Sequence, residues 1–422
     1  MALQVLDVFL HNEFIGKLSY QNGLLSFVYD NGYMREERPL PLSASLPLQG
    51  EAFDHALSES FFSGLLPESI IRERLARYLR ISAKNTFALL KEIGGECAGA
   101  VSVYPEGIRP DTQSENNYRI LEEDEAHEII SQLDKRPLMA GEDGIRISGA
   151  GAQDKLIVAL INGKLAIPKR NTPSTHILKP KIRDLEQTVQ NELFCMKLAK
   201  RVGLPVPKVE IFYLKGEAYY LVERYDRIQQ ENGKIQRLHQ EDICQALHIP
   251  PEQKYESEGG PTLKQCFDLL DTHIREGRMA GVNRMIMLQA VIFNFLIGNG
   301  DAHGKNFSIL YEGEGEALTP FYDLLCTCVY GDAYKNKMAM KIANKYKFTD
   351  VYVRHFERLG EMTGFKASFV RAQIEKIVIK TLREAPKLRA ELNNNSKTQS
   401  QIYENIIDII ETHCSQVMPK PL

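Results

Sequence analysis

One loop organises this 422-residue chain, and it reads Gly298-Asn299-Gly300-Asp301-Ala302-His303-Gly304-Lys305-Asn306. An apolar run at 285–297 precedes the loop, and a short apolar strand is expected at 307–310. So much Gly, Asn and Asp between two buried elements predicts a tight loop that presents functional groups at the end of a rigid helix. Asp301 and Asn306 offer a carboxylate and a carboxamide oxygen, which are donors that suit a hard cation. The alternative is a turn rich in helix-capping residues.

A second acidic motif follows the loop. Phe321-Tyr322-Asp323-Leu324 lies 17 positions beyond Asn306, after an expected hairpin turn at 312–316. A carboxylate held between hydrophobic neighbours can face into a cleft, so Asp323 is a candidate partner of the first loop. The alternative is that Asp323 caps a helix that begins at Leu324.

A run of small residues precedes an expected strand at 156–160. It extends from Ser148 to Ala152 within Ser148-Gly149-Ala150-Gly151-Ala152-Gln153-Asp154-Lys155. Small side chains let backbone N–H groups approach an anion closely. The run matches neither the P-loop motif nor the dinucleotide-binding glycine motif. We therefore expect a strand–turn–strand cover over phosphates, with a mobile surface turn as the alternative.

Two further elements could serve the same ligand. Lys179 ends a short apolar strand, where it can neutralise phosphates if Glu192, on an expected helix at 185–201, holds it in place. Lys181 is its rival, and an ordinary solvated lysine is the alternative. The segment 222–227, which includes Glu223, Arg224 and Tyr225, could offer its backbone to an adenine edge or form a surface ion-pair cluster.

The order of these parts is more specific than any one of them. A glycine-rich turn, a strand lysine, a helix glutamate, a linker, an Asp–Asn pair five positions apart and a second Asp follow one another as in a protein kinase. In kinases the first Asp accepts the proton of the substrate hydroxyl, while the Asn and the second Asp hold Mg²⁺. This order predicts phosphoryl transfer from Mg·ATP to a protein hydroxyl.

With these motifs in view, the chain resembles the HipA family of serine/threonine kinase toxins from bacterial toxin–antitoxin modules. The resemblance covers nearly the whole chain and is carried by 148–155, 238–247, 254–255, 259–261, 299–308 and 322–325. It implies an α+β, two-lobed protein-kinase-like fold related to the PI3/4K-like kinases, with an N-terminal β-rich subdomain and a helical C-terminal lobe.

The resemblance also implies roles for residues. Asp301 would be the catalytic base, Asn306 and Asp323 would hold Mg²⁺, and Ser148 would be a site of autophosphorylation. The expected ATP-binding residues are Ala150, Gly151, Ala152, Gln153, Asp154, Lys155, Lys179, Glu223, Arg224, Tyr225, His303, Gly304, Lys305, Asn306 and Asp323. Of these, Lys179 would contact the α/β-phosphates, His303 and Lys305 the phosphate end, and Glu223 and Tyr225 the adenine. Asp154 departs from the family, where Glu is common.

Family members phosphorylate an aminoacyl-tRNA synthetase, typically the glutamyl enzyme, which stalls translation and leads to growth arrest or persistence. The resemblance therefore implies a synthetase substrate, a HipB-like helix-turn-helix antitoxin as partner, and operator DNA bound through the antitoxin complex. Two other functions stay open. One is a small-molecule kinase of similar fold, and the other is a catalytically silent DNA-binding corepressor, against which the intact Asp301, Asn306 and Asp323 argue.

The pattern of apolar, polar and turn-forming residues along the chain predicts its division into domains. We expect an N-terminal β-rich subdomain at 1–105, a linker at 106–140, a kinase N-lobe with the glycine-rich loop and hinge at 141–225, and a helical C-lobe at 226–422. The expected elements are strands at 3–8 and 24–29, a turn at 12–16, a helix at 61–78, a hairpin of 209–214 with 219–222, and helices at 285–297, 351–362, 368–382 and 402–412.

Composition limits the other possibilities. The 52 basic and 55 acidic residues give a net charge of −3, so a chain-wide basic field for nucleic acid is excluded. A local patch remains at Lys335, Lys337, Lys341, Lys345 and Lys347 with Tyr334 and Tyr346, which could approach DNA phosphates or form a solvated face. The longest apolar run has about 13 residues, fewer than the roughly 20 that span a bilayer. With no CxxC pair and no signal peptide, we expect a cytoplasmic location and reduced cysteines.

Overall fold

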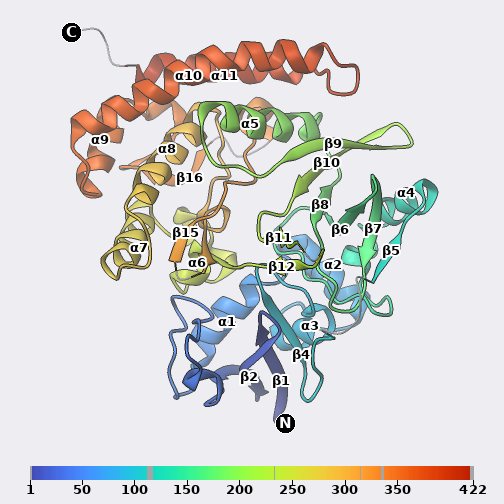
Figure 1. Ribbon diagram of the computed structural model, residues 1–422. Coiled ribbons are helices and arrows are strands. Elements are labelled where there is room, and N and C mark those ends of the chain that lie inside the picture. The colour runs from blue at the N-terminus through green and yellow to red at the C-terminus, as the bar shows by residue number, and fades with distance from the viewer. Residues whose placement is uncertain (1, 112–116, 232, 314, 334–336, 419–422) are drawn as a thin grey trace.

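The structure is a computed structural model that describes residues 2–111, 117–231, 233–313, 315–333 and 337–418. Figure 1 shows a β-rich N-terminal part at one end, a second sheet beside it, and a helical part at the other end. The predicted α+β fold with an N-terminal β-rich subdomain and a helical C-terminal part is confirmed.

The N-terminal subdomain is an antiparallel sheet with the strand order β3-β2-β1-β4 and three helices packed near it. Its elements are β1 (Gln4–Leu10), β2 (Glu13–Gln21), β3 (Leu24–Tyr29), β4 (Val101–Pro105), α1 (His55–Gly64), α2 (Ser69–Leu79) and α3 (Thr86–Ile93). The expected strands at 3–8 and 24–29 are confirmed, but the expected turn at 12–16 is wrong. The chain turns at His11 and Asn12, which adopt positive φ of 52° and 67°, and β2 begins directly afterwards.

The expected single helix at 61–78 is also wrong, because α1 ends at Gly64 and α2 begins at Ser69. Pro67 lies in the break, and proline lacks the N–H group that a continuous helix needs. The connecting segment 65–68 is mostly buried, and it faces the glycine-rich turn rather than solvent.

The second sheet has the strand order β5-β7-β6-β8-β10-β9. Its strands are β5 (Tyr118–Ile120), β6 (Leu156–Ile161), β7 (Lys164–Pro168), β8 (His176–Lys179), β9 (Val209–Leu214) and β10 (Glu217–Glu223), with α4 (Glu123–Ser131) after β5 and α5 (Thr188–Val202) after β8. The expected hairpin is confirmed, since Leu214 pairs with Glu217 across a two-residue turn. The segment 106–140 is more than the plain linker that we expected, because β5 pairs with β7 and extends this sheet.

The C-terminal part is built mainly from helices. They are α6 (Ile243–Ala246), α7 (Leu263–Arg275), α8 (Val282–Leu296), α9 (Val353–Met362), α10 (Ala367–Asn393) and α11 (Ile402–Val417). The small sheets are β11 (Arg227–Gln229) with β12 (Ile235–Arg237), β13 (His239–Asp242) with β14 (Ser308–Glu312) and β15 (Gly315–Leu318), and β16 (Lys337–Ile342) with β17 (Lys345–Lys347). The expected late helices are confirmed, although α10 runs 11 residues beyond the expected end at 382.

The centre of the helical part is α8, whose residues are mostly buried and mostly apolar. Phe293, Phe295 and Leu296 are at most 1% exposed. The helix ends at Leu296, and Gly298 follows with a φ of +69° that glycine tolerates; a Cβ added at Gly298 would lie 3.0 Å from the Cβ of Cys328. The buried helix therefore fixes the start of the loop at 298–306. Among the described residues, none of the helices combines the length and the apolar character that spanning a bilayer requires.

A buried ionic cluster joins the N-terminal subdomain to the end of β10. The Glu96 carboxylate lies 2.9 Å from the Arg227 guanidinium and 3.4 Å from that of Arg224. Asp226 accepts hydrogen bonds from Arg224 at 2.8 and 3.0 Å. Arg237 donates to the Val101 carbonyl at 2.7 Å. The alternative of an ion-pair cluster at 222–227 was therefore right in kind, but the cluster is buried instead of lying on the surface.

Candidate functional site

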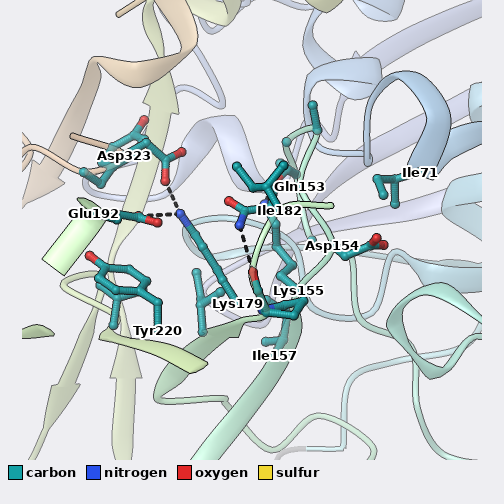
Figure 2. A pocket seen from close by; sticks show the side chains of 18 of the residues that line it. Ile71, Gln153, Asp154, Lys155, Ile157, Lys179, Ile182, Glu192, Tyr220 and Asp323 are labelled. Carbon is teal, nitrogen blue, oxygen red and sulfur yellow. Dashed lines mark hydrogen bonds and ion pairs between the residues drawn. The ribbon is translucent and has the colours of Figure 1, made fainter. Parts of the chain in front are cut away.

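A cavity of about 1130 Å³ lies between the second sheet and the helical part. It brings together the glycine-rich turn, the end of β8, the segment after β10, the loop at 298–306 and Asp323, which are separated by up to 175 positions in the sequence. All the predicted site residues line it except Gly304. Figure 2 shows its centre, where Lys179 points toward Glu192 and Asp323.

Gly304 serves the packing of its loop. A Cβ at this position would lie 2.3 Å from Cγ of Pro261 and 2.8 Å from Sγ of Cys244. Real side chains do not come so close, so only glycine lets the loop lie against these residues. The prediction of a ligand contact at Gly304 rested on its place in the motif, and the structure instead shows a close backbone approach.

Hydrogen bonds hold the loop at 298–306 in one shape. The side-chain Oδ1 of Asn299 accepts from the Asp301 N–H at 3.0 Å, and the Asn306 side-chain amide donates to the backbone carbonyl of Asp301 at 2.9 Å. The Tyr255 hydroxyl donates to the Asp301 carboxylate at 2.5 Å. The loop is therefore more than a turn of capping residues, because it holds the Asp301 carboxylate and the Asn306 carboxamide in the same cavity.

Asp323 enters the cavity from a backbone of unusual shape. Its φ of 53° is rare for a residue other than glycine, and such conformations gather at functional sites. No α-helix begins at Leu324 in the part of the chain that the structure describes, so the capping alternative is wrong. The Asp323 carboxylate instead pairs with the ammonium group of Lys179.

Lys179 is the central cation of the cavity. It is 6% exposed, lies 2.8 Å from the Glu192 carboxylate and also pairs with Asp323. Burial favours the neutral amine, but the two carboxylates outweigh it and raise the pKa of Lys179. Lys181 lines the same cavity but is exposed, so Lys179 is the lysine in the predicted position.

The same charges act on Asp323. Its partial burial would raise the pKa, but Lys179 and then Lys155 lower the pKa of Asp323 to about 2. The carboxylate is therefore ionised at any physiological pH, as a cation ligand must be.

The glycine-rich turn is docked against the protein and is not a mobile surface turn. The Ser148 hydroxyl is buried and donates to the Leu65 carbonyl, and Gly151 has a φ of +108° that glycine tolerates. The Gln153 amide donates to the Pro180 carbonyl at 3.2 Å. Asp154 faces Ile71 of α2 and not Lys179, as Figure 2 shows, and it pairs with Arg74 at 3.0 Å.

Lys155 also lines the cavity, and its ammonium group donates to the Ala150 carbonyl instead of forming a salt bridge within the described part of the chain. Burial, followed by repulsion from Lys179, lowers the pKa of Lys155 to about 8. A partly buried ammonium group that forms no salt bridge is costly, and an anion in the cavity would relieve that cost. This arrangement fits a phosphate ligand.

His303 and Lys305 lie at the other side of the cavity. The Nδ1 atom of His303 is buried without a hydrogen-bond partner in the described part of the chain. Burial and the charges of Lys254 and Lys305 hold the pKa of His303 well below its usual range, so the ring is neutral. Lys305 is itself buried and lies 2.5 Å from the Asp242 carboxylate, so its charge is already balanced by the protein.

The hinge segment offers fewer backbone groups than its sequence suggests. The Glu223 and Arg224 N–H groups donate to the carbonyls of Lys208 and Thr175, both at 2.9 Å. A hinge contact with adenine must therefore use the Tyr225 N–H or a carbonyl. The Arg224 side chain belongs to the ionic cluster with Asp226 and also lines the cavity, and its contact with a ligand stays a prediction.

An aromatic wall borders the hinge. The rings of Tyr225 and Tyr322 are stacked with centroids 5.9 Å apart and planes inclined by 23°. The Tyr322 hydroxyl donates to the Lys305 carbonyl at 2.8 Å, which fixes this ring against the loop at 298–306. A planar base could lie along such a wall.

A divalent cation has suitable donors here. Asp323 supplies a carboxylate, and the Asn306 amide nitrogen is engaged, which leaves its carbonyl oxygen for a cation. The described residues contain no group of three or more His, Cys, Asp and Glu that could hold a metal ion alone. This donor set fits Mg²⁺, which commonly takes one or two protein oxygens and completes its shell with phosphate and water.

Sequence reasoning gave no role to several residues that the cavity contains. Tyr255, Lys254, Tyr322 and Glu68 all line it or contact its loops. The Lys-Tyr pair at 254–255 and Tyr322 lay inside recognised motifs, which was a usable signal. Glu68 had none, because its partners are far away in the sequence.

The lysine-rich segment forms the hairpin of β16 and β17, away from this cavity. Lys337 and Lys341 lie over the Tyr346 ring at 5.7 and 4.8 Å, and Lys341 also pairs with Glu256 at 3.3 Å. Lys335 and Tyr334 lie outside the described residues. Part of the patch is therefore engaged within the protein, and DNA contact stays a prediction.

Comparisons with known proteins agree with this geometry. The chain matches the HipA-like C-terminal domain over residues 147–387 and the HipA N-terminal domain over residues 6–104. It is 41% identical to Y4mE of Sinorhizobium fredii, whose name designates it only provisionally as a kinase, over 90% of this chain and 91% of that protein. It is 31% identical to the serine/threonine-protein kinase toxin HipA of Shewanella oneidensis over 92% of this chain and 89% of that protein.

A solved structure is similar along nearly the whole chain. The Shewanella oneidensis HipA in a complex with HipB and operator DNA matches with a TM-score of 0.84 and 26% identity, covering 98% of this chain and 97% of that one. The fold and the site define a kinase-like protein with a lysine–carboxylate centre between two lobes. The chain belongs to the HipA family, and ATP is the nucleotide that a kinase family implies.

We predict that ATP affinity falls as pH rises through 8. The charged form of Lys155, which attracts phosphate, is populated below its pKa of about 8 and lost above it. Between pH 7 and 9 the charged fraction drops about tenfold, so affinity measured by calorimetry should drop by about the same factor. Lys155→Met should bind weakly and lose most of this dependence, whereas Lys164→Met, at the exposed first residue of β7, should keep it. An unchanged pH profile in Lys155→Met would contradict the role of Lys155.

Proposed function

We propose that this chain is an ATP-dependent serine/threonine protein kinase and the toxin of a toxin–antitoxin system. The observation that carries the proposal is the position of Lys179, which lies between Glu192 and Asp323 in the cavity that also contains Asp301 and Asn306. This is the set of groups that phosphoryl transfer needs, namely a cation for the phosphates, oxygen ligands for a metal and a carboxylate for the substrate hydroxyl.

The residues would divide the reaction as follows. Lys179 and Lys155 would bind phosphate oxygens beneath the glycine-rich turn, and the wall of Tyr225 and Tyr322 would border the base. Asp301 would accept the proton of the attacking hydroxyl. Mg²⁺, held by Asn306 and Asp323, would neutralise charge on the phosphates when bound. Catalysis would come mainly from positioning and from charge neutralisation, because the transition state is loose.

Substrate and partners are proposed from the relatives. The toxin name of the Shewanella oneidensis protein and its complex with HipB and operator DNA support a helix-turn-helix antitoxin and operator binding for this chain. We infer an aminoacyl-tRNA synthetase as substrate, with the glutamyl enzyme first, and growth arrest or persistence as the outcome. Partners of this kind would be met in the cytoplasm, which is where we infer that the protein acts. The boundaries 1–105, 106–140, 141–225 and 226–422 are kept as the proposed domains.

Ser148 is proposed as a site of autophosphorylation that switches the kinase off. Its hydroxyl is buried against the Leu65 carbonyl, so modification requires the turn to leave this position. A phosphate there would bring nearly two negative charges into the turn that covers the phosphates of ATP. Repulsion between the two would then keep the turn open and the nucleotide out.

Transfer should depend on Asp301. With radiolabelled ATP, Mg²⁺ and a bacterial lysate, we expect the wild type to label a discrete protein besides itself. Asp301→Asn should retain the fold and ATP binding but lose transfer by roughly a thousandfold or more, because the amide cannot accept the proton. Asp268→Asn, on the exposed side of α7, is the matched control and should label normally. Substantial labelling by Asp301→Asn would refute the base, and labelling of small molecules alone would favour a metabolite kinase.

Charge at position 148 should determine ATP binding. We expect Ser148→Asp to weaken ATP affinity by roughly tenfold or more through repulsion. Ser148→Asn introduces a side chain of the same size as Asp without its charge, so it should weaken ATP affinity far less. Calorimetry would measure the ATP affinity of both variants. Equal affinities for the two variants would show that the switch is not electrostatic.

A further inference from the structure

The N-terminal subdomain contacts the glycine-rich turn through residues that also line the cavity. The segment 65–68, between α1 and α2, lies beside the turn, and Pro67 forms a parallel β-bridge with Gly151. The Glu68 N–H donates to the Gly151 carbonyl at 3.1 Å, and the Leu65 carbonyl accepts from the Ser148 hydroxyl. Backbone groups of the subdomain are thus bonded to both ends of the turn's glycine-rich part.

A salt bridge extends this contact to the next residues. The Arg74 guanidinium, from α2, donates to both oxygens of Asp154 at 3.0 and 3.1 Å. The two side chains are 18% and 24% exposed, so water screens the pair only partly. Asp154 was expected to bind the nucleotide, and the structure instead gives its carboxylate to the subdomain.

The Glu68 side chain connects the same segment to the catalytic loop. Its carboxylate lies 2.7 Å from the Lys254 ammonium group and 3.7 Å from that of Lys305. Lys305 also lies 3.4 Å from the Gly64 carbonyl. Lys254 precedes Tyr255, whose hydroxyl donates to Asp301. One residue of the subdomain therefore contacts the cover of the cavity through its backbone and the loop beneath it through its side chain.

We propose that Arg74 and Glu68 are positioning residues, through which the N-terminal subdomain holds the glycine-rich turn closed over the phosphate site. This inference rests on the proposed function, in which the turn covers the phosphates of ATP. Because contacts with the subdomain hold the turn, ATP does not have to supply all of the interactions that order it. Release of this contact would also free the buried Ser148 hydroxyl.

The Arg74–Asp154 pair gives a direct test, because its charges can be exchanged. Arg74→Asp and Asp154→Arg should each speed amide hydrogen exchange in residues 148–154 and weaken ATP affinity roughly five- to tenfold. The double variant, which restores an opposite pair with the same total length, should recover most of both. Arg77→Asp, an exposed position of the same helix, is the control for a lost arginine and should alter neither measurement.

The outcomes separate the possible roles. If Asp154 contacted the nucleotide directly, Asp154→Arg would weaken binding, Arg74→Asp would not, and the double variant would not recover. That result, or unchanged exchange of the turn in Arg74→Asp, would overturn the proposal. A general loss of stability would speed exchange throughout the N-terminal subdomain and would not be restored by exchanging the charges.

Glu68→Gln tests the second contact. It keeps the size and the backbone bond of the residue but removes the charge beside Lys254 and Lys305. We expect a higher KM for ATP with little change in kcat, as suits a residue that closes the cover without taking part in transfer. A fall in kcat with an unchanged KM for ATP would overturn this role. Hydrogen exchange can be measured in the nucleotide-free protein and does not depend on kinase activity. If the wild type failed to bind ATP, the proposed function would be refuted. The exchange data would still show whether Arg74 and Glu68 hold the turn.

Discussion

Lys179 is buried between the carboxylates of Glu192 and Asp323, and this cluster ties together three parts of the chain. Lys179 ends a strand of the second sheet, Glu192 belongs to α5, and Asp323 lies beyond β15 in the helical part. A buried charge without its partner typically costs about 3–5 kcal/mol. Moving any one of the three elements would break the cluster, so the cluster fixes their relative positions. Lys179, Glu192 and Asp323 therefore form a rigid part of the cavity wall.

The N-terminal subdomain gives the cavity its second constraint. Glu96 anchors the hinge through the buried arginines, and the segment 65–68 lies against the glycine-rich turn. The segment after β10, the glycine-rich turn and the loop at 298–306 thus all contact the subdomain. Its sheet lies at one end of the molecule in Figure 1, yet residues of the segment 65–68 and of α2 line the cavity. In this chain the subdomain is part of the construction of the site and not an appendage.

Sequence patterns predicted the residues whose function requires a local motif. Asp301 and Asn306 have a fixed spacing, and Lys179 ends an apolar strand, so both signals were visible and both lie in the cavity. Glu68 could not be predicted, because its partners Lys254 and Lys305 are 186 and 237 positions away. A single helix was wrongly predicted at 61–78, because the helical spacing of its apolar residues was given more weight than the break that Pro67 causes. Arg224 and Asp154 were assigned to the ligand by position, although charged partners elsewhere in the chain hold their side chains.

Phosphoryl transfer at this site requires a metal–triphosphate to bind beside Lys179, Glu192 and Asp323, beneath the glycine-rich turn. A crystal structure with Mg²⁺ and a non-hydrolysable ATP analogue tests this most directly. We expect the phosphates between Lys179 and the turn, the metal on the oxygens of Asn306 and Asp323, and the γ-phosphate facing Asp301. Binding of the analogue at another place, or a metal that contacts neither Asn306 nor Asp323, would contradict the account.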